Sequence, residues 1–489
     1  MSGRGASSSP ARYDRRVEYD EALRWLAGLP DFERSGEFSD RPDLAPMRAL
    51  LAALGDPHLG RPTLHVAGSK GKGSTCAMAE RVLHAAGRRT GFYSSPHLHR
   101  YNERIRIDGE PLAPGRFGAA LATVREAMAR VEAQFPGRTL IAFDALTAAA
   151  FLAFREAGVD AQVVEVGLGG ALDSTNVFHD APHRAHVVAI TPISLEHTAI
   201  LGRTIPEIAA QKAGIITRGC VAVAAPQRES ALDVIRERAR AQDAALLEVA
   251  ATCQMARGRV SAEDQEFKLR TARATYAARL PLSGRHQLDN AATAVMACEG
   301  LAQRAGFALA PAHVRDGLAG VRWPARMEVL QRRPLVVVDG AHNGDSAKRM
   351  VEALREYVGV SQAVMLFGTL VDKDAGAMAA AVAPVARTVY VSGFPSRRAA
   401  DVRAVASAFA GGDAAVFTFG SLPQACDAAL ADAGPGGCVL AFGALAFAAA
   451  VREYILGIES DMIRVASAAA REAAQTRGGE AAPGQTHGQ

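Results

Sequence analysis

The sequence predicts a protein of the α/β class with two domains, each built on a mostly parallel sheet. Short β-branched runs alternate with longer segments of helical periodicity along most of the 489 residues, a pattern typical of strand–helix–strand units. The series breaks around residues 310–324, and a new strand–turn–helix series opens at Leu335. We therefore expect a large N-terminal domain followed by a smaller C-terminal domain of the same class.

The apolar runs and the helical segments give the expected elements in chain order. Runs rich in Val, Ile and Leu have the composition of strands buried in a parallel sheet. The predicted strands are Thr63–Ala67, Gln162–Val166, His186–Thr191, Leu335–Val338, Ala363–Phe367, Thr388–Val391 and Val439–Phe442. The segments with apolar residues at helical spacing are Ser74–Ala86, Arg116–Gln134, Ala145–Glu156, Ile205–Ala213, Ala291–Arg304 and Asp345–Tyr357.

The domain boundaries follow from composition. Residues 1–12 and 473–489 are rich in Gly, Ser and other small or polar residues, which predicts disordered tails. Between them we expect the large domain over residues 13–307, an interdomain linker over residues 308–325 and the small domain over residues 326–472. We also expect the linker to act as a hinge.

Composition excludes several classes of protein. The net charge of +4 is small for this length, so nucleic-acid binding is not expected. The six cysteines form no CxxC pair, which argues against a zinc or disulfide framework. The N-terminal segment has no apolar core, and the longest apolar stretch, residues 438–451, is too short to span a membrane. We expect a cytoplasmic protein with no membrane partner.

Lysine is scarce, with six lysines among 55 basic residues, and two of them lie in one glycine-rich segment. Residues 64–75, LHVAGSKGKGST, place an apolar strand, a glycine turn and a helix start in that order. The three glycines would let backbone amides converge on phosphate oxygens, Lys72 would reach the terminal phosphates and the Ser74 hydroxyl suits Mg²⁺. A purely structural turn is the alternative, but the ordered set favours a nucleotide phosphate site.

Polar residues also lie at or near the ends of three other apolar runs. Ser95 follows the run 91–93, Glu165 lies inside an apolar strand, and His197 comes shortly after a third strand. The carboxyl ends of neighbouring parallel strands share one crevice, so these groups could complete a Mg²⁺ shell with nucleotide oxygens and water. Each has an ordinary alternative in a turn or a loop hydrogen bond, although a carboxylate in an apolar strand is costly unless it is paired or coordinated.

Seven blocks of the chain read, in order, HVAGSKGKGST, YSSPHLHRYNERIRIDGEPL, VEVGLGGALDSTNV, ITPISLEHTAILGRTIPEIAAQKAGII, GRHQLDNAATA, WPARMEVL and VVVDGAHN. These blocks resemble folylpolyglutamate synthase and dihydrofolate synthase, a family of muramyl-ligase-like, ATP-dependent ligases that form amide bonds. The resemblance runs from about residue 19 to residue 450. It implies the Mur ligase architecture, with a P-loop ATPase-like N-terminal domain that binds ATP and folate and a Rossmann-like C-terminal glutamate-ligase domain.

The resemblance also implies the residues of the site. The nucleotide positions are Ser69, Lys70, Gly71, Lys72, Gly73, Ser74, Asn290, Arg326 and Asp339. The ligands of one or two Mg²⁺ are Ser95, Glu165, His197 and Lys212, the last as a carbamylated lysine, and a monovalent cation is a further expected cofactor. The positions against the pterin substrate are Ser94, Phe143, Asp144, Leu172, Asp173 and Ser174. The implied catalytic residues are Lys72, Lys212 and His342.

The chain departs from the family pattern within these blocks. Ser69 stands for Thr, Lys70 for Asn, Asp144 for Glu, Ala171 for Arg, Glu196 for Asp, Gln211 for Glu and Gly344 for Pro. The changes at positions 144 and 171 fall in the substrate region, so the preferred pterin form and polyglutamate chain length stay open.

Lys212 has a physical argument of its own. A buried lysine held neutral by neighbouring cations can react with CO₂, and the resulting carbamate is an anionic metal ligand, which arginine cannot form. The alternative is a surface ion pair between Lys212 and Glu207 on one predicted helix.

The activity implied by the resemblance is ATP-dependent addition of L-glutamate to the side-chain carboxylate of a folate through an acyl phosphate, by a monomer. This is a carbon–nitrogen ligase reaction of folate biosynthesis and one-carbon metabolism. The sequence leaves undecided whether the chain also has dihydrofolate synthase activity, which joins glutamate to dihydropteroate. The alternatives are a muramyl ligase of cell-wall precursors and a regulatory P-loop ATPase. The SPHL and NERIRIDG blocks disfavour the first, and the near-neutral charge and second α/β domain disfavour the second.

Overall fold

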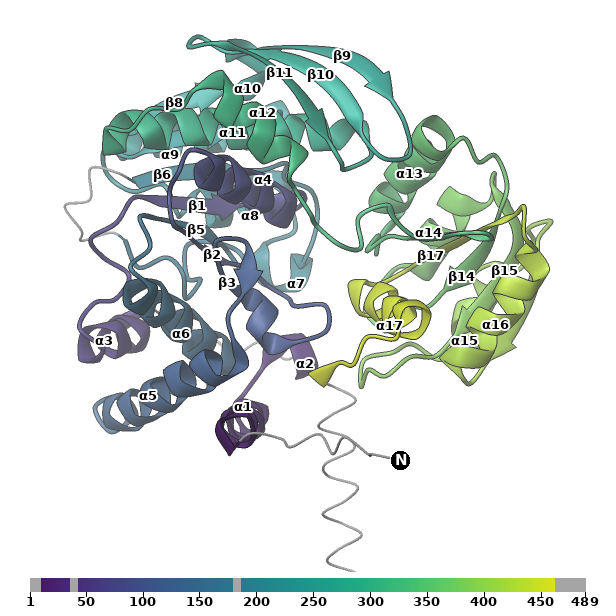
Figure 1. Ribbon diagram of the computed structural model, residues 1–489, viewed down its shortest axis with the longest axis horizontal. Helices are drawn as coiled ribbons and strands as arrows, with labels where there is room; N and C mark the ends of the chain where they lie inside the picture. The colour runs from purple at the N-terminus through teal and green to yellow at the C-terminus, as the bar shows by residue number, and fades with distance from the viewer. Residues whose placement is uncertain (1–9, 36–42, 179–185, 462–489) are drawn as a thin grey trace, which may run out of the picture.

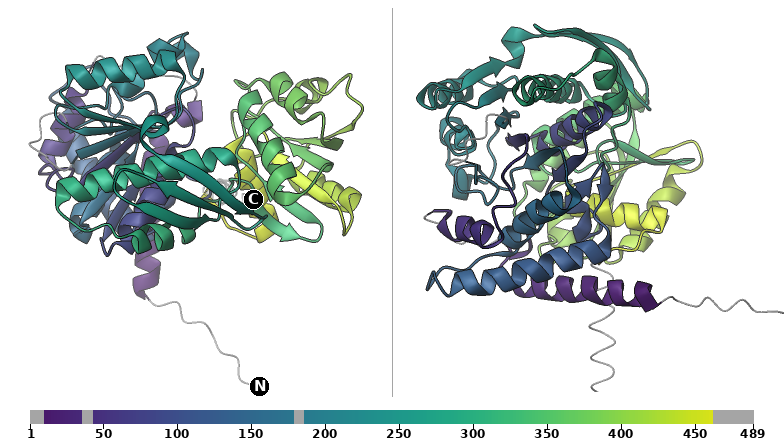
Figure 2. Two further views of the ribbon diagram at one scale, coloured as in Figure 1. Left: turned by 90° about the horizontal axis from the view of Figure 1, so that it is seen from above. Right: turned by 60° about the vertical axis from the view of Figure 1, so that its left-hand side comes forward.

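The computed structural model describes residues 10–35, 43–178 and 186–461, which form two lobes that lie side by side (Figure 1). The left view of Figure 2, from above, also shows the two lobes side by side. The first helix, α1 (Pro10–Gly28), begins inside the tail predicted over residues 1–12, so that prediction is wrong for its last three residues. Proline is tolerated in the first turn of a helix, which allows this earlier start. The rest of that tail, residues 462–472 and the tail predicted over residues 473–489 lie outside the described residues.

An eight-stranded sheet forms the centre of the large domain, with strand order β4-β3-β2-β5-β1-β6-β7-β8. The strands from β2 to β8 in this order pair in parallel, whereas β3 and β4 are antiparallel. Every residue of β1, β2, β5 and β6 is buried, as expected for strands covered on both faces. The strands are β1 (Thr63–Ala67), β2 (Thr90–Tyr93), β3 (Ile105–Ile107), β4 (Glu110–Pro111), β5 (Ala161–Glu165), β6 (His186–Ile190), β7 (Val221–Ala224) and β8 (Ala245–Glu248).

Helices cover both faces of this sheet (Figure 1). The helices α4 (Lys72–Ala85), α11 (Arg285–Ala305) and α12 (Pro311–Ala319) pack on one face. The opposite face is covered by α1, α3 (Ala45–Ala53), α5 (Pro114–Glu132) and α6 (Ala142–Ala157) at one end and by α7 (Thr198–Leu201), α8 (Ile205–Ala213) and α9 (Glu229–Ala241) at the other. The short helices α2 (Phe32–Ser35) and α10 (Val249–Thr252) complete the domain.

A three-stranded antiparallel sheet follows α10 and was not predicted. It consists of β9 (Gln254–Val260), β10 (Gln265–Arg270) and β11 (Thr275–Leu280). Buried residues alternate with exposed or half-buried ones along β10 and β11, and the buried Phe267 and Tyr276 belong to the same apolar cluster as α11. The sheet therefore extends the core on that side of the domain.

The small domain contains a six-stranded sheet of order β12-β13-β17-β14-β15-β16, parallel except for β12. Its strands are β12 (Glu328–Arg332), β13 (Leu335–Val338), β14 (Ala363–Phe367), β15 (Ala386–Ser392), β16 (Ala415–Phe419) and β17 (Cys438–Phe442). The helices α13 (Gly344–Ala353), α14 (Ala375–Val382) and α15 (Val402–Ser407) pack on one face, and α16 (Leu422–Ala433) and α17 (Leu445–Leu456) on the other.

The segment predicted as a linker over residues 308–325 is only partly one. Helix α12 occupies Pro311–Ala319 and packs on α4. The glycine at 317 makes this possible because a Cβ there would stand 2.6 Å from the Cα of Val82. The chain then crosses between the domains close to Ala325 and Met327, which both have positive φ. The predicted linker is therefore too long at its N-terminal side, since α12 belongs to the large domain.

Within the described ranges, no helix is both long and apolar enough to cross a membrane.

Candidate active site

The glycine-rich segment joins β1 to α4 and has the geometry of a phosphate loop. Gly68 and Gly71 have φ of +146° and +85°, and Gly71 caps the N-terminus of α4. The amides of Ser69 and Lys70 both donate to the carbonyl of Pro192, at 3.0 and 3.1 Å. The helix that begins at Lys72 directs its free N-terminal amides and its dipole toward the loop, which favours an anion there.

Two neighbouring side chains leave no room for a side chain at two of the loop glycines. A Cβ on Gly68 would lie 1.9 Å from the Oγ1 of Thr191, and a Cβ on Gly71 would lie 2.3 Å from the Oδ1 of Asn290. The buried Asn290 comes from α11 and donates to Gln287 at 3.0 Å. Asn290, a predicted nucleotide residue, therefore lies directly against the phosphate loop.

Lys72 and Lys212 both direct their ammonium groups to one carbonyl oxygen. Nζ of Lys72 donates to O of Gly68 at 3.3 Å, and Nζ of Lys212 donates to the same oxygen at 2.9 Å. Lys212 is 2 % exposed and also forms an ion pair with Glu196, Nζ to Oε1, at 2.9 Å. Burial lowers the pKa of Lys212, and Glu196 opposes that shift. Lys212 thus belongs to the phosphate loop's surroundings.

Glu207 is not the partner of Lys212. Its carboxylate instead accepts from the amides of Arg203 and Thr204, at 2.6 and 3.1 Å, at the start of α8. This capping arrangement satisfies amides that the helix itself leaves free. The surface pair considered for Lys212 is therefore absent.

Three of the four predicted metal ligands, Glu165, His197 and Lys212, interact electrostatically with Lys72. Glu165 ends β5, is buried, accepts a hydrogen bond from the Ser95 backbone amide and leaves Oε2 without a hydrogen-bond partner among the described residues. Burial raises the pKa of Glu165 to about 7, and Lys72 opposes this. His197 is exposed, with a φ of +47°, and interacts electrostatically with Lys72 and Lys212.

No three His, Cys, Asp or Glu side chains in the described parts of the chain are grouped so that they could hold a metal ion by themselves. The predicted set contains one carboxylate and one imidazole, with a hydroxyl and a modified lysine. Such a set needs oxygens from water and from the nucleotide to complete a Mg²⁺ shell.

The small domain faces this site with His342, Asp339 and Arg326. His342 lies after β13, and its Nε2 is 3.2 Å from Nζ of Lys70 in the phosphate loop. Asp339 accepts from the amides of Met327 and Ala341, both at 2.8 Å, and Arg326 donates to the carbonyl of Ala325 at 2.9 Å. His342 therefore lies at the contact between the domains, while the polar atoms of Asp339 and Arg326 mainly hold the crossover.

The predicted substrate residues form a buried hydrogen-bonded group behind the loop. Asp144 accepts from the Ser174 hydroxyl at 2.6 Å and from the Ile141 amide at 2.8 Å. Asp173 accepts from the Leu168 amide at 2.9 Å and from Thr175. These carboxylates therefore shape the glycine-rich turn after β5.

The remaining substrate positions differ in exposure. Phe143 lies half-buried against Gly167, whose added Cβ would stand 2.6 Å from its ring. Ser94 is buried and its amide donates to the carbonyl of Arg104 at 2.9 Å. Leu172 is 42 % exposed, so it is the apolar side chain of the set that a ligand could reach.

A second contact joins the domains through the segment that follows Ser95. His99 lies 3.0 Å from Glu453 of α17, Nδ1 to Oε1, and also contacts Arg452. Arg452 in turn donates to Glu328 of β12 at 2.7 and 3.0 Å, and Leu98 packs against the apolar cluster under α17. Figure 1 shows α17 on the side of the small domain that faces α2 and α7. The loop carrying Ser95 is thus held by both domains.

Several residues of the site carry no clear signal in the sequence. Thr191 and Pro192 support the phosphate loop through contacts that only the packed sheet creates. Trp323 covers Gly73, whose Cβ would stand 2.7 Å from the indole, and packs on Phe92. Tryptophan is rare in this chain, with two among 489 residues. The occurrence of one of them, Trp323, beside the crossover segment was the signal that could have indicated its role.

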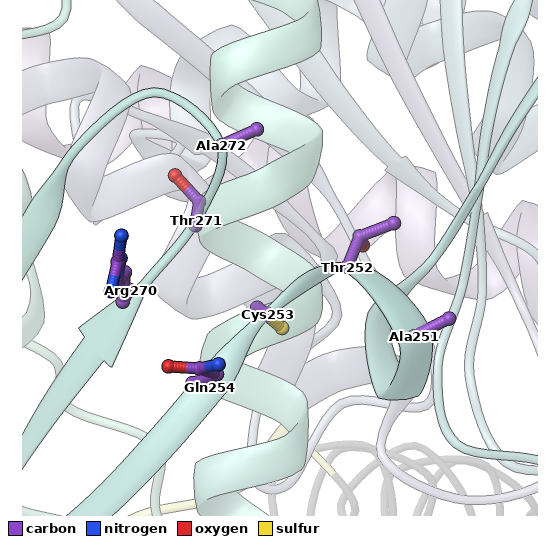
Figure 3. A pocket seen from close by; sticks show the side chains of 7 residues that line it. All are labelled: Ala251, Thr252, Cys253, Gln254, Arg270, Thr271 and Ala272. Carbon is purple, nitrogen blue, oxygen red and sulfur yellow. The ribbon is translucent and has the colours of Figure 1, made fainter.

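A separate hollow lies between α10 and the β9–β10 strands, away from the phosphate loop (Figure 3). Its lining residues are Ala251, Thr252, Cys253, Gln254, Arg270, Thr271 and Ala272. No group of acids, bases and metal ligands comparable to that at the phosphate loop is found there, so we place the site at the loop.

Comparison with known proteins gives the family of the chain. Residues 325–445 match the family described as Mur ligase, glutamate ligase domain. The chain is 33 % identical over 446 residues to a folylpolyglutamate synthase of Lacticaseibacillus casei, covering 91 % of this chain and 100 % of that protein. It is 36 % identical over 384 residues to a dihydrofolate synthase/folylpolyglutamate synthase of Mycobacterium tuberculosis, covering 75 % of this chain and 77 % of that protein.

A solved structure of Mycobacterium tuberculosis folylpolyglutamate synthase, complexed with ADP and AMPPCP, superposes with a TM-score of 0.82 at 33 % identity. The match covers 92 % of this chain and 100 % of that one. Fold and site define a two-domain ligase of the Mur ligase architecture, as predicted. More narrowly, the chain belongs to the folylpolyglutamate synthase/dihydrofolate synthase family.

Proposed function

We propose that the chain adds L-glutamate to the side-chain carboxylate of a folate, using ATP and passing through an acyl phosphate. One observation carries this proposal: the phosphate loop of the large domain meets His342 of the glutamate-ligase domain through Lys70, at 3.2 Å. Transfer from ATP to an acceptor requires that the nucleotide phosphates and the second domain come together, and this contact supports such an arrangement. A dihydrofolate synthase activity with dihydropteroate is a second candidate, because a relative at 36 % identity carries both names.

The first step needs charge neutralisation more than proton transfer. The folate carboxylate is ionised at pH 7, so its oxygen can attack the γ-phosphorus, forming the acyl phosphate while ADP leaves with the electron pair. The lysine ammoniums at positions 70 and 72, together with the free amides of α4, would stabilise the charge that spreads over the phosphoryl oxygens. Asn290, beside Gly71, supports the nucleotide on the same face of the loop.

The residues also fit a divalent cation. The Oε2 of Glu165 is buried without a hydrogen-bond partner in the described chain, and a carboxylate in that position is costly unless it is coordinated. Glu165, Ser95 and His197 would hold Mg²⁺ with water and phosphate oxygens. When bound, the ion supplies positive charge to the phosphoryl group. A second Mg²⁺ and a monovalent cation stay predictions.

We further propose that Lys212 carries a carboxylated amine in the working enzyme. Burial favours the neutral amine, whose lone pair forms an N–C bond with CO₂ as one proton leaves to solvent. The product is an anion in a region that interacts with Lys70 and Lys72. The unmodified lysine is paired with Glu196, so the modification would exchange that pair for contacts with the neighbouring cations.

The second step requires a neutral glutamate amine. Its nitrogen attacks the acyl carbon and forms the new C–N bond. The bond between the acyl carbon and the phosphate oxygen breaks, and inorganic phosphate leaves. The surplus ammonium proton needs an acceptor, and the Nε2 of His342 is the ring nitrogen that faces the phosphate loop. Closure of the domains around these groups would exclude the water that hydrolyses an acyl phosphate.

The test is an ADP-release assay on the full chain with ATP, Mg²⁺ and glutamate, comparing tetrahydrofolate, dihydropteroate and no acceptor. We expect release to require both glutamate and a pterin acceptor, and the preferred acceptor then decides between the two activities. Release without glutamate would instead support a regulatory ATPase, and release only with a cell-wall precursor would support a muramyl ligase. Lys72→Ala should abolish release, whereas Lys268→Ala on the exposed face of β10 is the matched lysine control.

The monomeric state and the cytoplasmic location stay predictions.

A further inference from the structure

The hydrogen bond between His342 and the Gly340 carbonyl fixes the tautomer of the imidazole. His342 Nδ1 lies 3.0 Å from the carbonyl oxygen of Gly340, and a carbonyl can only accept, so Nδ1 carries the hydrogen. The neutral ring then has its lone pair on Nε2, and the Lys70 ammonium, 3.2 Å away, is the donor to it. The proton-accepting atom of His342 is therefore occupied by a residue of the phosphate loop.

Few ion-pair partners hold the Lys70 ammonium next to His342. Among the residues that the structure describes, the one carboxylate within ion-pair distance of Lys70 is that of Glu196, at 3.9 Å. Glu196 is already paired at 2.9 Å with Lys212. The charges that act on Lys70 besides Glu196 are the cations Lys72 and Lys373 and the carboxylate of Asp345. The lysines around Glu196 therefore outnumber the carboxylates, including Glu196 itself. This excess of positive charge favours the binding of an anion.

The surroundings of His342, burial first and Lys70 second, also lower the pKa of its imidazole. Burial lowers the pKa of His342 to about 3, and Lys70, Lys373 and Arg326 add to the decrease while the bond to Gly340 opposes it. Burial likewise lowers the pKa of Lys70 to about 8. At pH 7 the pair is therefore mostly an ammonium that donates to a neutral imidazole.

We propose that Lys70 masks Nε2 of His342 before nucleotide binds, and that the phosphates of ATP draw the ammonium into the loop and release the histidine. Lys70 is a positioning residue in this scheme, and the proposal rests on the proposed function only in assigning His342 to the glutamate step. A phosphate carrying full negative charge offers a stronger charge-assisted hydrogen bond than a neutral imidazole does. This chain has Lys70 where asparagine is the commoner residue of the family pattern.

The test follows the His342 ring by NMR in the full chain with ¹⁵N-labelled histidine, assigned by comparison with His342→Gln. The samples are the parent, Lys70→Asn and Lys70→Arg, each without ligand and with AMPPCP and Mg²⁺. In the parent we expect AMPPCP to raise the pKa of His342. In ligand-free Lys70→Asn that pKa should already be higher by about one pH unit or more, whereas Lys70→Arg, which keeps a cationic donor, should retain the parental value.

The negative charge of the nucleotide by itself also raises the pKa of a nearby imidazole, and the variants separate this direct effect from the release of Lys70. The direct effect is present in both Lys70→Asn and the parent. The pKa shift of His342 on AMPPCP binding in the parent, minus the shift in Lys70→Asn, therefore measures the release of Lys70. Lys268→Asn removes one lysine from β10 and should leave the titration of His342 unchanged.

Two results would overturn the proposal: equal pKa values for His342 in the ligand-free parent and Lys70→Asn, or equal shifts on AMPPCP binding in both. The measurement needs nucleotide binding alone, so it is independent of the assay with glutamate and a pterin acceptor. Failure of that assay with a positive NMR result would refute the proposed activity and leave the nucleotide-linked release in place.

Discussion

Gly71 offers the sharpest test of the phosphate loop. Its φ of +85° lies in the left-handed region, where a side chain costs roughly 1–2 kcal/mol. An added Cβ would stand 2.3 Å from Oδ1 of Asn290, and overpacking of this kind costs ~1–3 kcal/mol. The amides of Ser69 and Lys70 tie the loop to Pro192, so the loop cannot move away freely. We expect Gly71→Ala to lower the free energy of unfolding by about 2–5 kcal/mol.

A matched glycine separates the backbone strain from the contact with Asn290. Gly87 has a φ of +76°, close to that of Gly71, but no atom lies within 4 Å of its added Cβ. Gly87→Ala should therefore lose only the roughly 1–2 kcal/mol of left-handed strain. Urea denaturation of both variants measures the difference, and equal losses would refute the contact that we describe.

The double variant Gly71→Ala/Asn290→Ala tests the same contact from its other side. Removing the amide of Asn290 makes room for the methyl group, so the two changes should be non-additive in stability. Nucleotide binding should not recover, because the double variant lacks the Asn290 amide. We expect the KM for ATP to rise about tenfold or more in both the single and the double variant, since a tenfold change corresponds to the loss of only ~1.4 kcal/mol. A parental KM for ATP in the double variant would show that Asn290 does not contribute to nucleotide binding.

Three further substitutions have expected outcomes. Lys212→Arg should abolish glutamate-dependent ADP release and keep the parental circular-dichroism spectrum, because arginine cannot be carboxylated; near-parental turnover in bicarbonate-free buffer would contradict this. Gly317→Ala should cost ~1–3 kcal/mol in urea denaturation, since its Cβ would stand 2.6 Å from Val82, and an unchanged midpoint would argue against close packing of α12 on α4. Arg452→Leu should cost roughly 1–3 kcal/mol because Glu328 loses one of its two donors in the described chain and keeps only the Ala325 amide. The same substitution removes the contact with His99 of the large domain and should increase the radius of gyration in small-angle scattering; an unchanged value would show that the Arg452–His99 contact does not hold the domains together.

The parts of the fold that the sequence predicts well are those governed by burial alone. All seven predicted strands occur, because strands covered on both faces read as continuous apolar runs, as in β1 and β14. The antiparallel strands β9 to β11 were missed, since one face is exposed and charged residues such as Lys268 interrupt the run. The parallel strands β2 and β7 were missed as well, although they are mostly buried, and each has only four residues. Their period-two alternation is visible in β11 and was the available signal.

The linker shows a different kind of failure. Proline at 311 is a favourable first residue of a helix, but the glycines at 317 and 320 read as helix breakers. Gly317 is in fact required by its distance to Val82, a contact between segments more than 200 residues apart that no local pattern expresses. The hydrogen bonds of Asp144 and Asp173 have the same character, because their partners come from another helix or from the folded turn.

The scarcity of lysine acquires a physical meaning from the site. Four of the six lysines act on the same few groups: Lys70, Lys72 and Lys212 on Glu196, and Lys373 on His197 and His342. Two ammoniums share the carbonyl of Gly68, and a compact cation suits this crowding where the wide, planar guanidinium does not. These four lysines therefore lie where several charges fit into a small volume, whereas Lys268 lies on the exposed face of β10 and takes no part in this site. The proposed change of partner of Lys70 adds a second reason for a compact cation at that position.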